Sequence, residues 1–151
     1  MSVRYVIVCP LRPLNVGDRY RRADWPLHVT VAGNFLWDAS ESVLTERVAA
    51  ALRGHRAIDL VVGEEAMFGP AHTIRVNQTI PDARLNTLHE SLIDDRMQFA
   101  EPQFLRAGFH GHITHVAEGQ RVAGDHVKLD HVALVEVADP SVVRAVWPLA
   151  G

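Results

Sequence analysis

Short apolar runs recur along this chain, and most have the length and the β-branched composition of strands. We predict strand segments at Arg4–Cys9, Leu27–Leu36, Ile58–Phe68, His72–Asn77, Phe109–Ala117, His126–Val137 and Val142–Pro148. Two stretches between them instead repeat apolar residues every three or four positions, which is the period of an amphipathic helix. Strands and helices do not alternate regularly, so the pattern predicts an α+β fold in one domain, residues 1–151.

Local signals at the ends support the two helices. Asp38 and Glu41 have the spacing of a capping box, and Gly54 is placed to end the first helix. Pro81 and Asp82 open the second helix, whose apolar face carries Leu85, Leu88 and Leu92. Two segments lack any period, Pro10–Pro26 and Asp95–Gly108, and we predict both to be irregular.

Composition narrows the class of protein. The chain has 151 residues, 15 basic and 18 acidic side chains, a net charge of −3 and one cysteine. Such a balance excludes a surface built to bind a polyanion over its whole area. Cys9 lies in an apolar run, so we expect a buried structural thiol. The sequence has no signal-peptide pattern and no apolar run long enough to cross a membrane, and we expect a cytoplasmic protein.

The candidate chemistry is a repeated triplet, His-x-Thr. The triplet His-x-[Ser/Thr] occurs at His28, His89 and His112. On a strand, residues i and i+2 point to the same side, whereas on a helix they lie about 200° apart. We therefore set aside His89, which falls in the second helix, and retain "LHVTVAG" and "FHGHITH". Each of these pairs an imidazole and a hydroxyl on one face of a strand.

Two imidazoles suit acid–base catalysis, because their ordinary pKa near 6.5 allows one to be protonated while the other is neutral. One ring would take a proton from an attacking water while the other gives one to a leaving oxygen. The neighbouring hydroxyls of Thr30 and Thr114 would hydrogen-bond the oxygens of a phosphate. This residue set fits attack on a cyclic phosphodiester without a metal or other cofactor.

These motifs resemble those of the 2H phosphoesterases, which include the 2'-5' RNA ligase-like proteins and the RNA 2',3'-cyclic phosphodiesterases. "LHVTVAGNF" matches the first motif of the family and "FHGHIT" the second, where the family commonly has Pro in place of Gly111. "RYVIVCPL", "FGPAHTIRV" and "VVRAVWPL" resemble its other strands.

The resemblance implies a bilobal α+β fold, in which two pseudo-symmetric antiparallel sheets flanked by helices form a central cleft. His28 and His112 would be the catalytic pair, and Thr30 and Thr114 would bind phosphate. The substrate would be a nucleotide or an RNA end with a 2',3'-cyclic phosphate. Which histidine is the acid, and whether the reaction runs toward hydrolysis or ligation, stays open. His115 follows the second motif where relatives often have an apolar residue, so a cationic phosphate ligand would have to come from elsewhere.

Further residues are candidates for substrate contact. His110 lies two positions before His112, Arg12 and Trp25 lie in the loop before the first motif, and Arg106 closes the segment "FAEPQFLR", which we interpret as a lid over the cleft. Two other functions stay open: a nucleotide- or RNA-end-binding protein without turnover, and a metalloenzyme using His28, His110 and His112. We expect a monomer without an obligatory protein partner.

Overall fold

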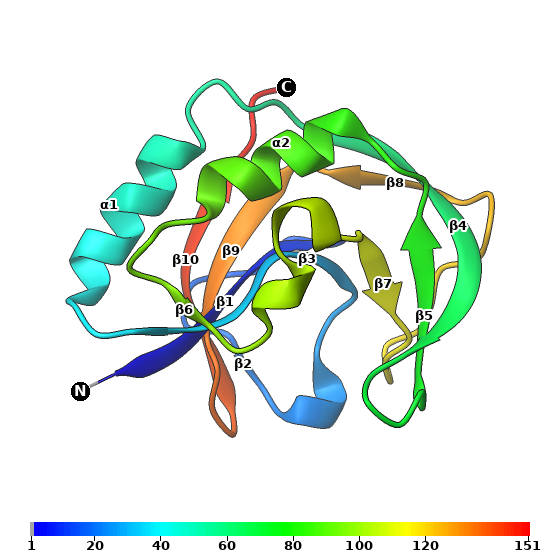
Figure 1. Cartoon of the computed structure of the whole chain (residues 1–151), viewed down its shortest axis with the longest axis horizontal. Helices are drawn as coiled ribbons and strands as arrows, with labels where there is room; N and C mark the ends of the chain where they lie inside the picture. The colour runs from blue at the N-terminus through cyan, green and yellow to red at the C-terminus, as the bar shows by residue number, and fades with distance from the viewer. Residues whose placement is uncertain (1) are drawn as a thin grey trace.

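A computed structural model describes residues 2–151 and shows an α+β fold built around one strongly curled antiparallel sheet (Figure 1). The main strands are β1 (Val3–Pro10), β3 (His28–Trp37), β4 (Ile58–Phe68), β5 (Ile74–Thr79), β7 (His112–Thr114), β8 (His126–Leu129), β9 (His131–Glu136) and β10 (Ser141–Pro148). Two strands are short: β2 (Arg19–Tyr20) pairs with β10 at one end of the sheet, and β6 (Gln98–Phe99) pairs with β3. The helices are α1 (Glu41–Ala51) and α2 (Ala83–Leu92).

The strands follow the order β2-β10-β9-β1-β3-β7-β5-β4-β8, with β6 paired to β3 outside this path. The expected two sheets are therefore joined into one. The two halves meet where β3 pairs with β7, through Val29 and Ile113. Because these residues are fully buried, the junction of the halves is part of the hydrophobic core. The first half runs from β2 to β3, with β9 at its centre, and the second runs from β7 to β8, with β5 and β4 at its centre.

The apolar pattern predicted most strands because the runs are buried. Tyr5 to Cys9 of β1 are all almost inaccessible, because Tyr5, Ile7 and Cys9 pack in one hydrophobic cluster and Val6 and Val8 pack in another on the opposite face. A strand covered on both faces is expected to be apolar throughout rather than alternating. Cys9 lies within this strand as the expected buried thiol, and burial raises its pKa to about 12.

The strand predicted at His72–Asn77 is observed at Ile74–Thr79, and three other features differ from the sequence prediction for local reasons. The strand predicted at Phe109–Ala117 is reduced to His112–Thr114, because the flanking backbone forms local turns: Phe109 N–H donates to Arg106 and Val116 N–H to Gly119. His126–Val137 is two strands that separate at Asp130. The N-cap of α1 is Ser40 rather than Asp38, since the Ser40 hydroxyl accepts from Val43 N–H.

The segment between α2 and β7 is largely irregular, as predicted, but it contains the short strand β6 and two short 3-10 helices, η2 (Pro102–Phe104) and η3 (Arg106–Gly108). In Figure 1 these turns lie in front of the sheet, between α2 and β7. The loop before the first motif likewise contains one 3-10 turn, η1 (Arg22–Asp24). Neither helix of the described chain has the length and apolar composition needed to cross a membrane.

Candidate active site

The two His-x-Thr motifs lie on adjacent strands at the junction of the two sheet halves. Val29 of β3 is the register partner of Ile113 of β7, and both side chains are completely buried. Successive residues of a strand point to opposite faces. The residues on either side of this pair therefore share the opposite face, and they are the half-buried motif residues His28, Thr30, His112 and Thr114.

The antiparallel register sets how these four side chains alternate. Extending the Val29–Ile113 pair by one residue in each direction places His28 beside Thr114 and Thr30 beside His112. Cross-strand neighbours have Cβ atoms about 4.5–5.5 Å apart. Each imidazole thus has one hydroxyl two residues along its own strand and another directly across the sheet.

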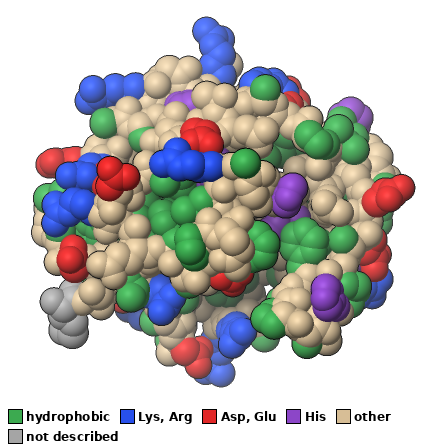
Figure 2. All heavy atoms as spheres, viewed as in Figure 1, with side chains coloured by type: hydrophobic (Ala, Val, Ile, Leu, Met, Phe, Trp, Pro, Cys, Tyr) green, Lys and Arg blue, Asp and Glu red, His purple; other side chains and the backbone are tan. Residues whose placement is uncertain are grey.

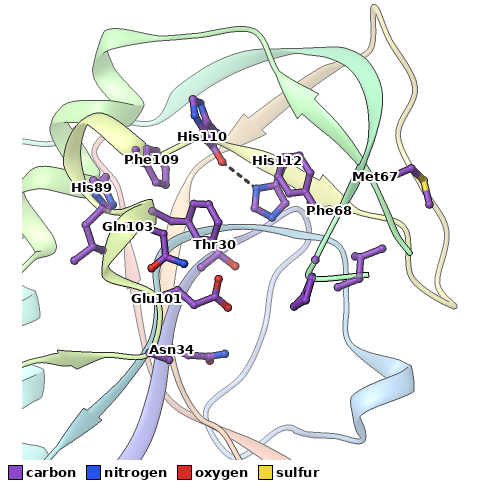
Figure 3. Close-up of a pocket in the computed structure, with 18 of the residues that line it drawn as sticks. Thr30, Asn34, Met67, Phe68, His89, Glu101, Gln103, Phe109, His110 and His112 are labelled. Atoms are coloured by element: carbon purple, nitrogen blue, oxygen red, sulfur yellow. Dashed lines mark hydrogen bonds between the residues drawn. The ribbon is translucent and has the colours of Figure 1, made fainter. Parts of the chain in front are cut away.

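Both imidazoles are oriented by the same local hydrogen bond. Nδ1 of His28 lies 2.8 Å from the carbonyl oxygen of Pro26, and Nδ1 of His112 lies 2.9 Å from that of His110 (Figure 3). A carbonyl oxygen only accepts, so Nδ1 of each ring carries the hydrogen. In the neutral rings, Nε2 then holds the lone pair, and within residues 2–151 it has no hydrogen-bond partner.

Each ring also packs against one aromatic side chain. The ring of Trp25 lies 5.4 Å from that of His28, and the ring of Phe68 lies 4.8 Å from that of His112, edge-on. Contacts of this kind restrict the side-chain torsions in addition to the hydrogen bond at Nδ1. The two histidines are therefore held in defined orientations by equivalent means.

The surroundings of both rings favour the neutral form. Burial lowers the pKa of His28, and the charge of a protonated His112 lowers it further, against the opposing effect of the Pro26 carbonyl. Burial likewise lowers the pKa of His112, against the opposing effect of the His110 carbonyl, and the charge of a protonated His110 adds a smaller lowering effect. The mutual repulsion means that the two rings do not readily hold two protons at once. Such a pair suits a reaction that needs one acid and one base.

The two threonine hydroxyls have no hydrogen-bond partner among the described side chains and backbone groups. They lie half-buried on the same face as the imidazoles. A free hydroxyl in this position can donate to an anionic oxygen. The face thus offers two imidazoles and two hydroxyl donors within one small area.

A cavity of about 750 Å³ opens beside this face and is lined by Thr30 and His112. His28 and Thr114, which are neighbours across the two strands, do not line this cavity. Figure 2 shows the hollow, bordered by histidine and hydrophobic side chains. The other walls come from β3, from the β4–β5 turn, and from the segment around η2 and η3, which includes Glu101, Gln103 and Phe104. The lid predicted at Phe99–Arg106 is therefore one wall of this cavity.

The structure brings only one of the four further candidates to the cavity. His110 lines it, and its carbonyl orients His112. Arg12 instead pairs with Glu118 at 2.6 Å, and the same carboxylate accepts from Leu27 N–H. Trp25 contacts His28 but does not line the cavity.

Arg106 is also engaged elsewhere, because its guanidinium pairs with Glu90 at 2.6 Å. Its backbone has a positive φ of 55° and donates to Nε2 of His89. His89 donates from Nδ1 to the Val31 carbonyl and stacks on Phe109 at 4.1 Å. Burial lowers the pKa of His89. The histidine set aside in the sequence thus connects α2, β3 and η3 as a neutral structural group.

Sequence reasoning did not single out Asn34, Phe68, Glu101 or Gln103 as individual residues. Asn34 follows the first motif on β3, and Phe68 ends β4, so the positions of both depend on the curl of the sheet. Within residues 2–151, no group of three or more His, Cys, Asp and Glu side chains is arranged to hold a metal ion.

Solved structures share this fold over the whole chain. One described as a phosphoesterase is 15% identical, with 99% of both chains covered and a TM-score of 0.58. Escherichia coli LigT complexed with 3'-AMP is 15% identical over 100% of both chains, with a TM-score of 0.57. The same protein complexed with phosphate is 13% identical over 99% of both chains, with a TM-score of 0.59. A search of curated protein sequences gives no significant match.

The sequence itself identifies the family. The profile of the 2'-5' RNA ligase superfamily matches residues 8–136, which include both motifs and all walls of the cavity. The chain therefore belongs to the 2'-5' RNA ligase superfamily, a group of 2H phosphoesterases.

Proposed function

We propose that this protein hydrolyses a cyclic phosphodiester, the 2',3'-cyclic phosphate of a nucleotide or an RNA end, using His28 and His112 as its acid–base pair. The observation that carries the proposal is the matched orientation of the two rings. Each donates Nδ1–H to the carbonyl two residues before it and leaves Nε2 free on the same sheet face. A ring fixed in one tautomer needs no reorganisation to accept or give a proton at Nε2.

The reaction adds one water across one P–O bond. Nε2 of the neutral histidine takes a proton as the water oxygen bonds to phosphorus, and the bond from phosphorus to one ribose oxygen breaks. The other histidine, protonated, gives its Nε2 proton to that leaving oxygen. Each role supplies about 10²–10⁴-fold in rate. Thr30 and Thr114 would hydrogen-bond the two non-bridging oxygens, where negative charge builds up.

Phosphate binding would also prepare the acid. Burial and mutual repulsion keep the two rings from both being protonated in the free protein. A phosphate placed between them carries a negative charge, which favours one protonated ring. Binding of the substrate would thus supply the charged acid beside the neutral base.

The ligands of a structural relative support a nucleotide substrate. Escherichia coli LigT has been crystallised with 3'-AMP and with phosphate. A ribonucleoside 3'-monophosphate is one of the two products that opening a 2',3'-cyclic phosphate can give. The cavity beside the motifs has the volume expected for a small-molecule site, about 300–1,000 Å³.

The test is turnover of nucleoside 2',3'-cyclic monophosphates by the purified protein in the presence of EDTA. We expect a monophosphate product, with kcat/KM following a bell-shaped pH profile centred on the acidic side of 6.5 because both pKa values are lowered. A matched control is His126→Ala, which removes an exposed histidine of β8.

Three outcomes separate the candidate functions. Turnover in EDTA that disappears in the double variant His28→Ala/His112→Ala supports the proposal. Activity that EDTA abolishes and zinc restores would assign a metalloenzyme instead. Tight nucleotide binding without any turnover would assign a binding protein with the same cleft.

A further inference from the structure

The wall of the cavity formed by η2 carries an unpaired carboxylate beside an exposed aromatic ring. Glu101 precedes this 3-10 turn and Phe104 ends it, with Phe104 N–H donating to the Glu101 carbonyl at 3.1 Å. Both side chains line the cavity, and that of Phe104 is 54% exposed.

The charge of this cavity is unusual for a site that holds a phosphorylated ligand. Glu101 is the only carboxylate among the lining residues, and none of them is Lys or Arg. Its side chain makes no ion pair or hydrogen bond within residues 2–151. Figure 3 shows Glu101, Gln103 and Asn34 in the part of the cavity away from His110. This part is suited to an uncharged hydrogen-bond donor rather than to a polyphosphate.

We infer that Glu101 and Phe104 form a base-binding subsite that selects guanine, with the ring stacked on Phe104 and its Watson–Crick edge on the carboxylate. This inference rests on the proposed function, since the cyclic phosphate would occupy the motif face. A carboxylate only accepts hydrogen bonds. Guanine is the one common base that presents two adjacent donors, N1–H and the N2 amino group, on that edge.

The other bases match this edge less well. Adenine places the N1 lone pair, and cytosine the N3 lone pair, next to a single amino donor, so one carboxylate oxygen would face an acceptor. Uracil has one N–H between two carbonyl oxygens, both of which repel the carboxylate. A matched two-hydrogen-bond contact of a side chain with a base discriminates by about 1–3 kcal/mol, which corresponds to about 5- to 150-fold.

The stacking partner is available because the neighbouring aromatic rings are already engaged. One face of Phe109 is covered by His89, and the rings of Phe68 and His112 pack in a T-shaped contact. Phe104 has no ring partner among the described aromatic pairs and is exposed in the cavity. Stacking of a base on an aromatic side chain strengthens binding by about 5- to 150-fold and does not depend on the identity of the base. Phe104 would therefore supply affinity and Glu101 selectivity.

The experiment measures kcat/KM for the guanosine, adenosine, cytidine and uridine 2',3'-cyclic monophosphates with the wild type, Glu101→Gln and Glu46→Gln. Glu46 is an exposed carboxylate of α1 that does not line the cavity, so its variant is the matched control. We expect at least a tenfold preference for guanosine in the wild type and in the control. In Glu101→Gln, kcat/KM should fall for the guanosine substrate and not for the other three, so the preference for guanosine is lost. The ratio of kcat/KM for adenosine to that for guanosine should therefore rise, because an amide can both donate and accept.

Other results would overturn the inference. Turnover of all four substrates within threefold would show that no base is selected. An equal loss on all four in Glu101→Gln would assign this carboxylate to the ribose or the phosphate. Phe104→Ala should lower kcat/KM for all four substrates, and an unchanged value would exclude the stacking role.

Binding measurements keep this inference separate from the proposed function. Calorimetry compares guanosine and adenosine 3'-monophosphates with the wild type and Glu101→Gln, with circular dichroism to verify folding. If no cyclic nucleotide is turned over but guanosine monophosphate binds at least tenfold more tightly, the hydrolysis proposal fails and the base subsite stands. Equal affinity for both ligands would remove the subsite whether or not hydrolysis occurs.

Discussion

The two strands that carry the motifs hold equivalent side chains on very different supports. β3 has ten residues and pairs along most of its length with β1, whereas β7 has three residues, with one register partner on β3 and three on β5. Yet both histidines make the same Nδ1 hydrogen bond and lie next to an aromatic ring. A long, regular strand is thus not required to present this motif, provided that other contacts fix the short one.

The contacts that fix β7 come from outside the strand. His115 follows it and donates from Nε2 to Oδ1 of Asn77, which in turn donates to the Gly63 carbonyl. On the other side, the Gly111 carbonyl accepts from Thr79 N–H. The short strand is therefore held at both ends by β5. These contacts give His115 a structural role in holding the end of β7.

The largest effect is expected from removing either imidazole. His28→Ala and His112→Ala should each lower kcat/KM for a cyclic nucleotide by about 10²–10⁴-fold, because each removes one proton-transfer group. Melting temperatures should stay close to that of the wild type, since both side chains are half-buried on the motif face rather than packed in the hydrophobic core. Steady-state assays with His126→Ala as control test this. A variant that keeps near-normal turnover would exclude that histidine from the chemistry.

The second expected effect distinguishes the supports of the two strands. A Cβ at Gly111 would lie 2.5 Å from the Thr79 hydroxyl and 2.7 Å from Leu85, whereas at Gly33 it would meet only the Thr30 methyl group at 3.2 Å. Thr79 and Leu85 are both buried, so relieving these contacts requires a shift within the packed interior. Gly111→Ala should therefore destabilise the protein by about 1–3 kcal/mol.

The two glycine variants should also differ in catalytic activity. Displacing a catalytic group by 1 Å can cost about 10²-fold, so Gly111→Ala should reduce kcat/KM far more than Gly33→Ala. Urea unfolding and the cyclic nucleotide assay measure the two quantities. Equal losses in both variants would show that β7 is no more dependent on its surroundings than β3.

The same contrast explains what the sequence could predict. The strand of the first motif was identified almost to its ends because its apolar residues are buried within the sheet. The sequence overestimates the extent of β7 because "FHGHITHVA" has the composition of a strand, while the backbone at Phe109 and Val116 instead forms turns with residues three positions away. The placement of both His-x-Thr triplets on strands could nevertheless be predicted, since their spacing requires only local geometry.

The substrate cavity was harder to predict than the motifs. Glu101 and Phe104 lie in an irregular segment without periodicity, so no pattern indicates which side chains face the cleft. The joining of the two expected sheets through Val29 and Ile113 also depends on a pairing 84 positions apart (113 − 29). Long-range pairings of this kind leave no local signal in a single sequence.

A smaller effect is expected from the threonines. Thr30→Val and Thr114→Val keep the side-chain shape and remove one hydroxyl donor to a charged oxygen, which contributes about 1.5–3 kcal/mol. Each variant should therefore lose about 10- to 100-fold in kcat/KM. Kinetic assays with inorganic phosphate as a competitive inhibitor test this, because the inhibition constant should rise in parallel. Loss of turnover without weaker phosphate binding would contradict the assigned role.

The smallest effect is the pH dependence of stability, in which the motif histidines and His89 act together. Their pKa values are lowered in the folded protein, mainly by burial. Between each lowered pKa and the ordinary value near 6.5, the unfolded chain binds more protons than the folded one, so the free energy of unfolding falls as the pH falls through that window. The slope cannot exceed about 1.4 kcal/mol per pH unit for each histidine.

Urea unfolding at pH 7.5, 6.5 and 5.5 measures this slope. His28→Asn and His112→Asn should each flatten the decrease in stability below pH 6.5, and by similar amounts, because both rings are half-buried in equivalent settings. The double variant should keep the part due to His89, whose Nδ1 and Nε2 both have partners in the neutral form. A slope that stays unchanged in the double variant would mean that the motif histidines are more accessible to water than their packing against Trp25 and Phe68 implies.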